Sequence, residues 1–122
     1  MTHKTEIRFE NLEPSAFDGK LRERINEIVK KVQDIQERSL THNVDIDKWE
    51  WDGKEEVGAS ITIKPRTSFY NEGEKGFDRM FIILGPRGGV HHSEKSNIYG
   101  RTKYDEESQP FKKTLKAIDF MM

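Results

Sequence analysis

The chain has 122 residues, of which 33% are hydrophobic, so it can bury one compact core but not a second. Its 21 basic and 22 acidic residues give a net charge of −1, which excludes a strong overall attraction to nucleic acids or anionic lipids. It contains no cysteine, so disulfides, thiolate nucleophiles and cysteine-ligated metals are excluded. We therefore expect one domain over residues 1–122.

The N-terminal residues are charged where a signal peptide would be apolar, and no segment has the ~18 apolar residues of a membrane span. We expect a cytoplasmic protein with no membrane partner. Ile7 and Phe9 then alternate with charged residues, which predicts a short half-buried strand. Pro14 ends this pattern, and Ser15 with Asp18 is a predicted N-cap pair for the helix that follows.

A long helix is predicted over residues 19–38, because six apolar residues repeat at helical spacing and share one face. Gly19 weakens the first turn, so we expect the helix to start cleanly only after it. An apolar face of this width needs a sheet as its partner. Its residues are Leu21, Ile25, Ile28, Val29, Val32 and Ile35.

The next segment predicts a hairpin. Val44 and Ile46 alternate with polar residues, and Trp49 and Trp51 alternate one residue out of phase, which predicts a β-bulge near Asp47–Lys48. The dipeptide Asp52-Gly53 predicts a two-residue turn after this strand.

Two further strands and a helix complete the predicted fold. Residues 57–64 alternate in hydropathy, and the apolar run 80–84 predicts a central strand covered on both faces. Loops are expected over 66–78 and 91–105. Pro110 begins a shorter helix, so the predicted fold class is α+β, in the order β-α-β-β-β-α, with both helices on one face of a mainly antiparallel sheet. The apolar residues of that second helix are Phe111, Leu115, Ile118 and Met122.

Three segments carry a resemblance to a known family: Ile7–Ser15 (IRFENLEPS), Leu21–Gln36 (LRERINEIVKKVQDIQ) and Asn43–Ile46 (NVDI). They resemble the ribosome-hibernation family of the light-repressor type. Its members begin with a short strand, then a small polar residue and a proline, a long helix of mixed charge and a three-stranded sheet. The resemblance covers about a third of the chain. It implies a protein directed at the ribosome or its RNA, and it assigns no individual binding residue.

Charge is distributed unevenly along the chain. Residues 20–31 carry a net charge of +3, residues 45–56 a net charge of −4, and residues 64–103 a net charge of +4. Lys20, Arg24 and Lys31 share one flank of the predicted helix, either as a phosphate-contacting stripe or as a solvated surface in which Glu27 pairs with Lys31.

A second candidate site is the turn Gly85-Pro86-Arg87-Gly88-Gly89. Exposed backbone N–H groups and one arginine in such a turn can bind a phosphate, although the turn lacks the GK[ST] ending of a P-loop. The alternative is a connecting turn in which glycines supply positive φ. The loops beside it combine arginines with aromatic residues, a composition that either stacks on bases or holds the loops on the sheet. The full set of ligand-binding candidates is Lys20, Arg24, Lys31, Arg66, Phe69, Arg79, Arg87, Gly88, Gly89, Tyr99 and Arg101.

No catalytic or metal-binding motif is present in the sequence. His91 and His92 are adjacent, so on an extended segment they point to opposite sides and do not share one site. We expect no cofactor. Catalysis by His92 with Glu94, or with a carboxylate of the acidic strand, is the remaining enzymatic alternative.

Trp49 and Trp51 lie in the acidic segment 45–56. They are expected in the core or at a dimer seam, or else as an anchor for a basic protein partner. The favoured function is a non-catalytic protein that binds RNA, the ribosome or another phosphate-bearing ligand. The alternative is a small phage-type accessory protein that sequesters a nucleotide signal, within one chain or across a homodimer, or that inhibits a host protein through the acidic hairpin.

Overall fold

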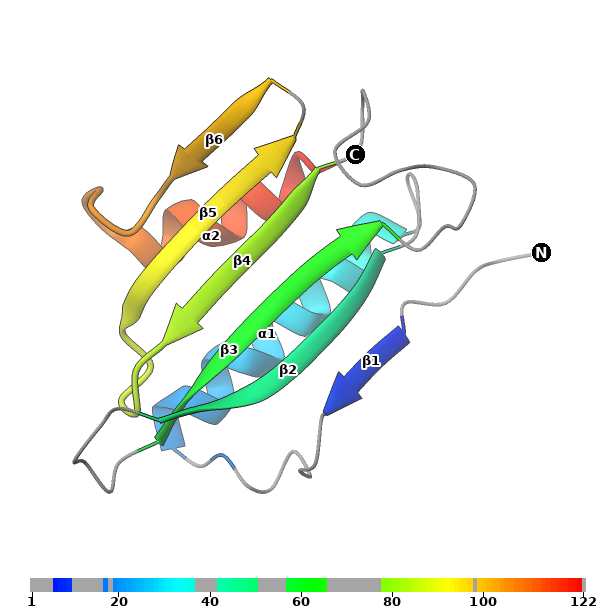
Figure 1. The fold of residues 1–122 in the computed structure, drawn as a ribbon. Coiled ribbons are helices and arrows are strands. Elements are labelled where there is room, and N and C mark those ends of the chain that lie inside the picture. Colours follow the sequence, from blue (N-terminus) through cyan, green and yellow to red (C-terminus); the bar gives the residue numbers. More distant parts are fainter. Residues whose placement is uncertain are drawn as a thin grey trace.

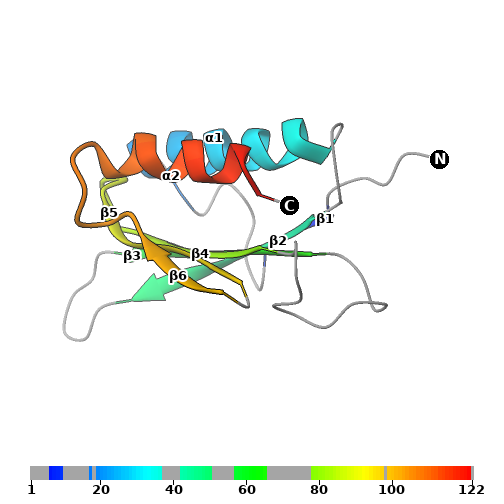
Figure 2. The same ribbon diagram turned by 90° about the horizontal axis from the view of Figure 1, so that it is seen from above.

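The computed structural model describes residues 6–9, 17, 19–36, 42–50, 57–65, 78–97 and 99–121. In these residues six strands form a single sheet, and two helices cover one of its faces (Figure 1 and Figure 2). The predicted α+β class, with both helices on the same face, is confirmed.

The order of strands in the sheet is the same as their order in the chain. β1 pairs with β2 in parallel, and every other neighbouring pair is antiparallel. The elements are β1 (Glu6–Phe9), α1 (Gly19–Gln36), β2 (His42–Glu50), β3 (Val57–Pro65), β4 (Arg79–Leu84), β5 (Val90–Asn97), β6 (Gly100–Lys103) and α2 (Pro110–Asp119).

The segment 91–105, predicted as a loop, instead contains most of β5 and all of β6, so the predicted order lacked two strands. On the helix-facing side of β5, Ser93 and Asn97 form hydrogen bonds in place of apolar contacts. The sequence 91–105 therefore shows no alternation of apolar and polar residues. The hydroxyl oxygens of Ser93 and Thr114 are buried and lie 2.7 Å apart. At the far end of the strand, the Asn97 amide donates a hydrogen bond of 2.9 Å to Asp78.

α1 packs as its sequence pattern predicts. All but one of its six apolar residues are buried, and Val29 packs against the core from its edge. The helix begins at Gly19 itself, where φ is +57°, a left-handed backbone conformation that glycine adopts without strain. The predicted N-cap pair of Ser15 and Asp18 lies outside the described residues.

β2 contains no bulge, so that prediction was wrong. Its register with β3 is continuous from His42 opposite Pro65 to Glu50 opposite Val57. The change in pattern has another cause: Val44 and Ile46 are buried under the helices, whereas the last four residues of the strand are exposed whichever face they lie on. The predicted turn at Asp52-Gly53 lies outside the described residues.

β4 is a central strand, as predicted, but only one of its faces is fully covered. Met80, Ile82 and Leu84 are buried beneath the helices, whereas Phe81 and Ile83 on the opposite face are only half-buried. The prediction of burial on both faces was therefore wrong. Figure 2 shows that both helices lie on one face of the sheet. The alternation along β4 puts Met80 on that face and the half-buried Phe81 on the other.

Of the four apolar residues predicted for this helix face, Ile118 is the one that the described structure shows as buried. Thr114, Ala117 and Ile118 are buried, together with Met121 just after the helix. Phe111 and Leu115 are only partly buried at the edge of the core, and Met122 lies outside the described residues. The contact between Thr114 and Ser93 turns the helix so that a polar side chain faces the sheet.

Tyr104 follows β6, and its backbone N–H donates to the carbonyl of Ser93 at 2.8 Å. Burial raises the pKa of the Tyr104 hydroxyl above its ordinary value of 10.0; the charges of Glu107 and Asp78 add to this effect, and a hydrogen bond with Thr102 opposes it. A raised pKa means that the folded state holds its proton longer than the unfolded state. The resulting stabilisation is complete below pH 10 and is lost as the pH rises through the higher pKa of the folded state.

We therefore expect the stability of Tyr104→Phe to fall less steeply than that of the wild type above pH 10. Urea denaturation at pH 8 to 11 measures this difference. Tyr99→Phe removes an exposed hydroxyl and serves as the control, which should follow the wild-type curve. Parallel curves for Tyr104→Phe and the wild type would contradict the prediction.

Candidate functional site

The sheet has an open face, which we define as the face opposite the two helices. The strand register places Arg79, Ser96 and Arg101 side by side across β4, β5 and β6. One row further along, Thr62, Phe81 and Glu94 are neighbours across β3, β4 and β5. Polar and charged groups from four strands therefore meet around the half-buried ring of Phe81.

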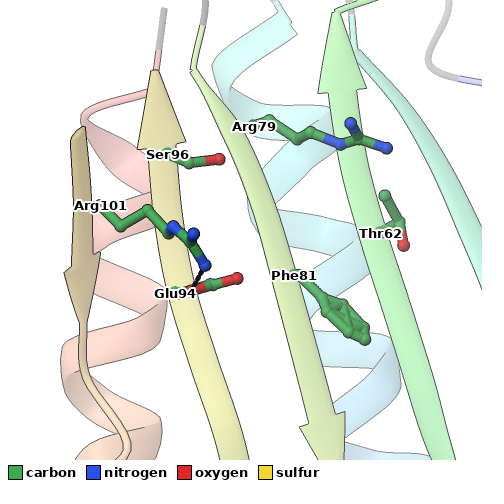
Figure 3. Close-up of a pocket in the computed structure, with 6 residues that line it drawn as sticks. All are labelled: Thr62, Arg79, Phe81, Glu94, Ser96 and Arg101. Carbon is green, nitrogen blue, oxygen red and sulfur yellow. Dashed lines mark ion pairs between the residues drawn. The ribbon is translucent and has the colours of Figure 1, made fainter. Parts of the chain in front are cut away.

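These six residues line a pocket of 430 Å³, which we call the open-face pocket (Figure 3). Figure 3 shows the Arg79 side chain reaching from β4 over β3, and the Arg101 side chain reaching from β6 over β5. The two guanidinium groups thus lie on either side of β4, which carries Phe81. Such an arrangement can bind anionic groups at two points and leave an aromatic surface between them.

Glu94 is the acidic residue of the open-face pocket. Its Oε2 lies 3.8 Å from Nη1 of Arg101, and the side chain of Arg101 is 72% exposed while that of Glu94 is 18% exposed. Its Oε1 lies 3.6 Å from Nε2 of His92, whose ring stands at 54° to that of Phe81 with 5.6 Å between the centroids. Lys103, opposite Glu94 on β6, is exposed and adds a further positive charge at this edge.

Of the predicted ligand-binding residues, the structure brings Arg79 and Arg101 together in this pocket. Tyr99 is 72% exposed in the turn between β5 and β6, and its backbone N–H donates to Asn97 Oδ1 at 2.8 Å. Arg66 and Phe69 lie outside the described residues.

The second predicted site, the turn 85–89, lies at the other end of β4. The N–H of Gly88 donates to the carbonyl of Gly85 at 2.9 Å, and Gly85 donates in turn to Gly89 at 2.7 Å. Gly88 has a φ of +85°, as the connecting-turn interpretation requires. Arg87 and His91 contribute to a small pocket of 200 Å³ beside this turn.

The predicted basic stripe on α1 is not one surface. Arg24 is half-buried: its Nη1 donates to the carbonyl of Gly88 at 2.9 Å, and its guanidinium lies 4.3 Å from the centroid of the Phe111 ring. Lys31 pairs with Asp119 of α2 at 2.8 Å. Lys20 is exposed and lies against Gly88. Arg24 and Lys31 therefore connect α1 to other elements. Of these three residues, only Lys20 adds an exposed positive charge next to the turn 85–89.

The two adjacent histidines occupy different places, as expected of an extended segment. His92 faces the open side beside Phe81, whereas His91 sits at a register shift near Leu84 and lies beside Gly85. Among the described residues, no group of three or more His, Asp or Glu side chains is placed to hold a metal ion.

Trp49 is 38% exposed and lies opposite Gly58. The alternation along β2 puts it on the open face, on the same side of the strand as Asp45 and Asp47. It is therefore not a core residue. Trp51, the other half of the predicted pair, lies outside the described residues.

The sequence did not identify three residues of the pocket, Thr62, Phe81 and Ser96, and it named Glu94 only as a possible catalytic partner of His92. Phe81 was assigned to the core because it lies in an apolar run, and Glu94 and Ser96 were assigned to a loop. Their alternation with Ser93 and Lys95 is a strand signal in principle, but none of these side chains is apolar.

In the described part of the chain, neither helix combines the length and the apolar content that crossing a bilayer requires. The chain matches no protein-family model, no curated protein and no solved structure.

Proposed function

We propose that this protein is a non-catalytic RNA-binding protein, and that single-stranded RNA lies across the open face of its sheet. The observation that carries the proposal is the open-face pocket, where Arg79 and Arg101 flank Phe81. Guanidinium groups bind phosphates in a bidentate manner, and an exposed aromatic ring stacks on an unpaired base. Among the described residues both helices lie on the other face, so a half-buried Phe on this central strand suits this role better than a role in the core.

The charge distribution supports the same use of this face. The overall charge is −1, so affinity for a polyanion must come from local charge. On the β4–β6 side of the described open face, Arg79, Arg101 and Lys103 outnumber the single acid Glu94. On the β2 side lie Asp45 and Asp47, and Lys64 of β3 pairs with Asp45 at 3.7 Å. This difference in charge favours RNA binding along the β4–β6 side and disfavours RNA binding over β2.

The resemblance of residues 7–15, 21–36 and 43–46 to ribosome-hibernation proteins supports ribosomal RNA as the target. A cytoplasmic location belongs to the same proposal.

We expect Arg101→Ala, and more strongly the double variant with Arg79→Ala, to weaken binding to a uridine decamer. For single strands, the slope of log K against log salt is about −0.7 per phosphate contacted, so loss of two contacts should reduce its magnitude by about 1.4. Fluorescence anisotropy over a salt series measures both the affinity and this slope. Co-sedimentation with ribosomes over the same series tests whether ribosomal RNA is bound.

Arg22→Ala is the matched control, because it removes the same charge from an exposed position on α1, on the opposite side of the sheet. It should leave the slope unchanged. If the double variant is folded and binds the decamer with the wild-type affinity and slope, the open face is not the RNA-binding surface.

A further inference from the structure

Glu94 has an unusual environment for a carboxylate. Its Oε2 is buried, yet within the described residues it accepts no hydrogen bond. Its ion-pair partners lie 3.8 Å from Oε2 and 3.6 Å from Oε1, which is beyond hydrogen-bonding distance. Buried polar atoms are nearly always hydrogen-bonded, so this carboxylate lacks much of its usual hydrogen bonding. The Glu94 side chain is 18% exposed and lines the open-face pocket, so the part of the carboxylate that faces the pocket can accept from a ligand.

The position of this carboxylate restricts what the ligand offers. In Figure 3 it lies between the Arg101 guanidinium and the Phe81 ring. Unpaired bases held on an aromatic side chain are read on their Watson–Crick and Hoogsteen edges. An ionised carboxylate only accepts hydrogen bonds, so the base edge that contacts Glu94 has to donate them.

Guanine matches a carboxylate better than the other bases. Its N1–H and N2–H groups are adjacent donors, so both can face the negatively charged carboxylate. Adenine and cytosine each place a ring-nitrogen acceptor next to their amino group, and uracil places its N3–H between two carbonyl oxygens. Each of these would bring an acceptor against the negative charge of Glu94, which disfavours binding.

We infer that the open-face pocket selects guanine, with Glu94 as the residue that reads the base. Arg79 and Arg101 bind the phosphates in this arrangement, and Phe81 supports the ring. The inference rests on the proposed function, because it names the nucleotide that the same pocket prefers. It extends that function from phosphate binding, which has no sequence preference, to recognition of one base.

The test compares four decamers: a uridine decamer, and three copies in which one central uridine is replaced by G, A or C. We expect the wild type to prefer the G-containing decamer by about 5- to 150-fold, the range of a bidentate contact. Glu94→Gln keeps the size of the side chain but offers one acceptor and one donor. In that variant we expect affinities within about twofold across the four decamers, with no loss of affinity for the uridine decamer because a negative charge is removed.

Glu106→Gln is the matched control, since it neutralises an exposed carboxylate in the turn before α2. It should retain the preference for guanine. A second measurement titrates free guanosine and adenosine monophosphates while following the NMR signals of Phe81 and Glu94. This separates a preference for the base from binding along an RNA strand.

The outcomes distinguish the inference from the proposed function. Decamers that bind in a manner dependent on Arg79 and Arg101, but without base preference, overturn the guanine inference and leave the proposed function standing. If guanosine monophosphate shifts the Glu94 signals, adenosine monophosphate does not, and no decamer binds, the guanine inference holds, and the ligand is a free nucleotide and not RNA. Equal shifts with both nucleotides overturn the guanine inference. If neither ligand binds, both proposals are wrong.

Discussion

Replacing Ile28 with alanine is expected to lower the free energy of unfolding by about 2–5 kcal/mol, the usual cost of truncating a buried isoleucine. Ile28 is completely buried near the middle of α1, in the layer between the helix and the sheet. The substitution leaves a cavity that a packed sheet cannot close by a small shift. Urea denaturation measures the loss, and at about 4 °C per kcal/mol the melting temperature should fall by about 8–20 °C.

Two further variants on the same helix serve as comparisons for Ile28→Ala. Ile28→Val removes one methylene group and should cost about 0.5–1.5 kcal/mol. Asn26→Ala lies on the exposed side of α1 and should change the stability little. A melting temperature of Ile28→Ala within a degree or two of the wild type would contradict the packing of α1 on the sheet.

Gly88→Ala is expected to lower the free energy of unfolding by about 2–3 kcal/mol, because an L side chain at positive φ is strained and the space beside it is occupied. The φ of Gly88 is +85°. A Cβ atom there would lie 3.1 Å from both Arg24 Cδ and Lys20 Cγ, and 3.2 Å from the carbonyl oxygen of Lys20. The last contact is with backbone, so the turn itself has to move away from α1. That movement would also break the hydrogen bond between Arg24 and the Gly88 carbonyl.

The neighbouring glycine offers a close control. A Cβ atom on Gly89 would meet no atom within 4 Å, and its φ is not positive. Gly89→Ala should therefore melt close to the wild type. Equal melting temperatures for the two alanine variants would show that neither the backbone conformation of the turn nor its contact with α1 matters for stability.

The apolar elements of the fold could be predicted from the sequence because burial is their only strong signal. The spacing of Leu21 to Ile35 defines the buried face of α1, and the alternation in 57–64 defines the inward side of β3. β5 could not be predicted in this way, because Val90 is its one residue packed on the apolar core and the contacts described further along its inward side are hydrogen bonds. Ser93 with Thr114, and Asn97 with Asp78, replace the apolar side chains that make a strand visible in a sequence.

The candidate site could be predicted only in part, for a related reason. Arg79 and Arg101 were identified from residue type alone, but they are 22 positions apart and meet only because β4, β5 and β6 are adjacent. Without β5 and β6, nothing places Glu94 beside Phe81. Arg24 was predicted to bind phosphate because it lies on the flank of a helix. In the structure its guanidinium instead donates a hydrogen bond to the Gly88 carbonyl and packs on the Phe111 ring.

The position of β6 at the edge of the described sheet gives its basic side chains a second role. It is the last strand on its side of the described sheet, it has only four residues, and all of them are exposed. Edge strands of this kind can recruit strands from other chains, and charged side chains are one of the ways in which proteins prevent such aggregation. We therefore expect the charges of Arg101 and Lys103 to disfavour intermolecular pairing at this edge as well as to attract anions to the open face. Any substitution that neutralises both would reduce solubility even where it leaves the fold of the single chain intact.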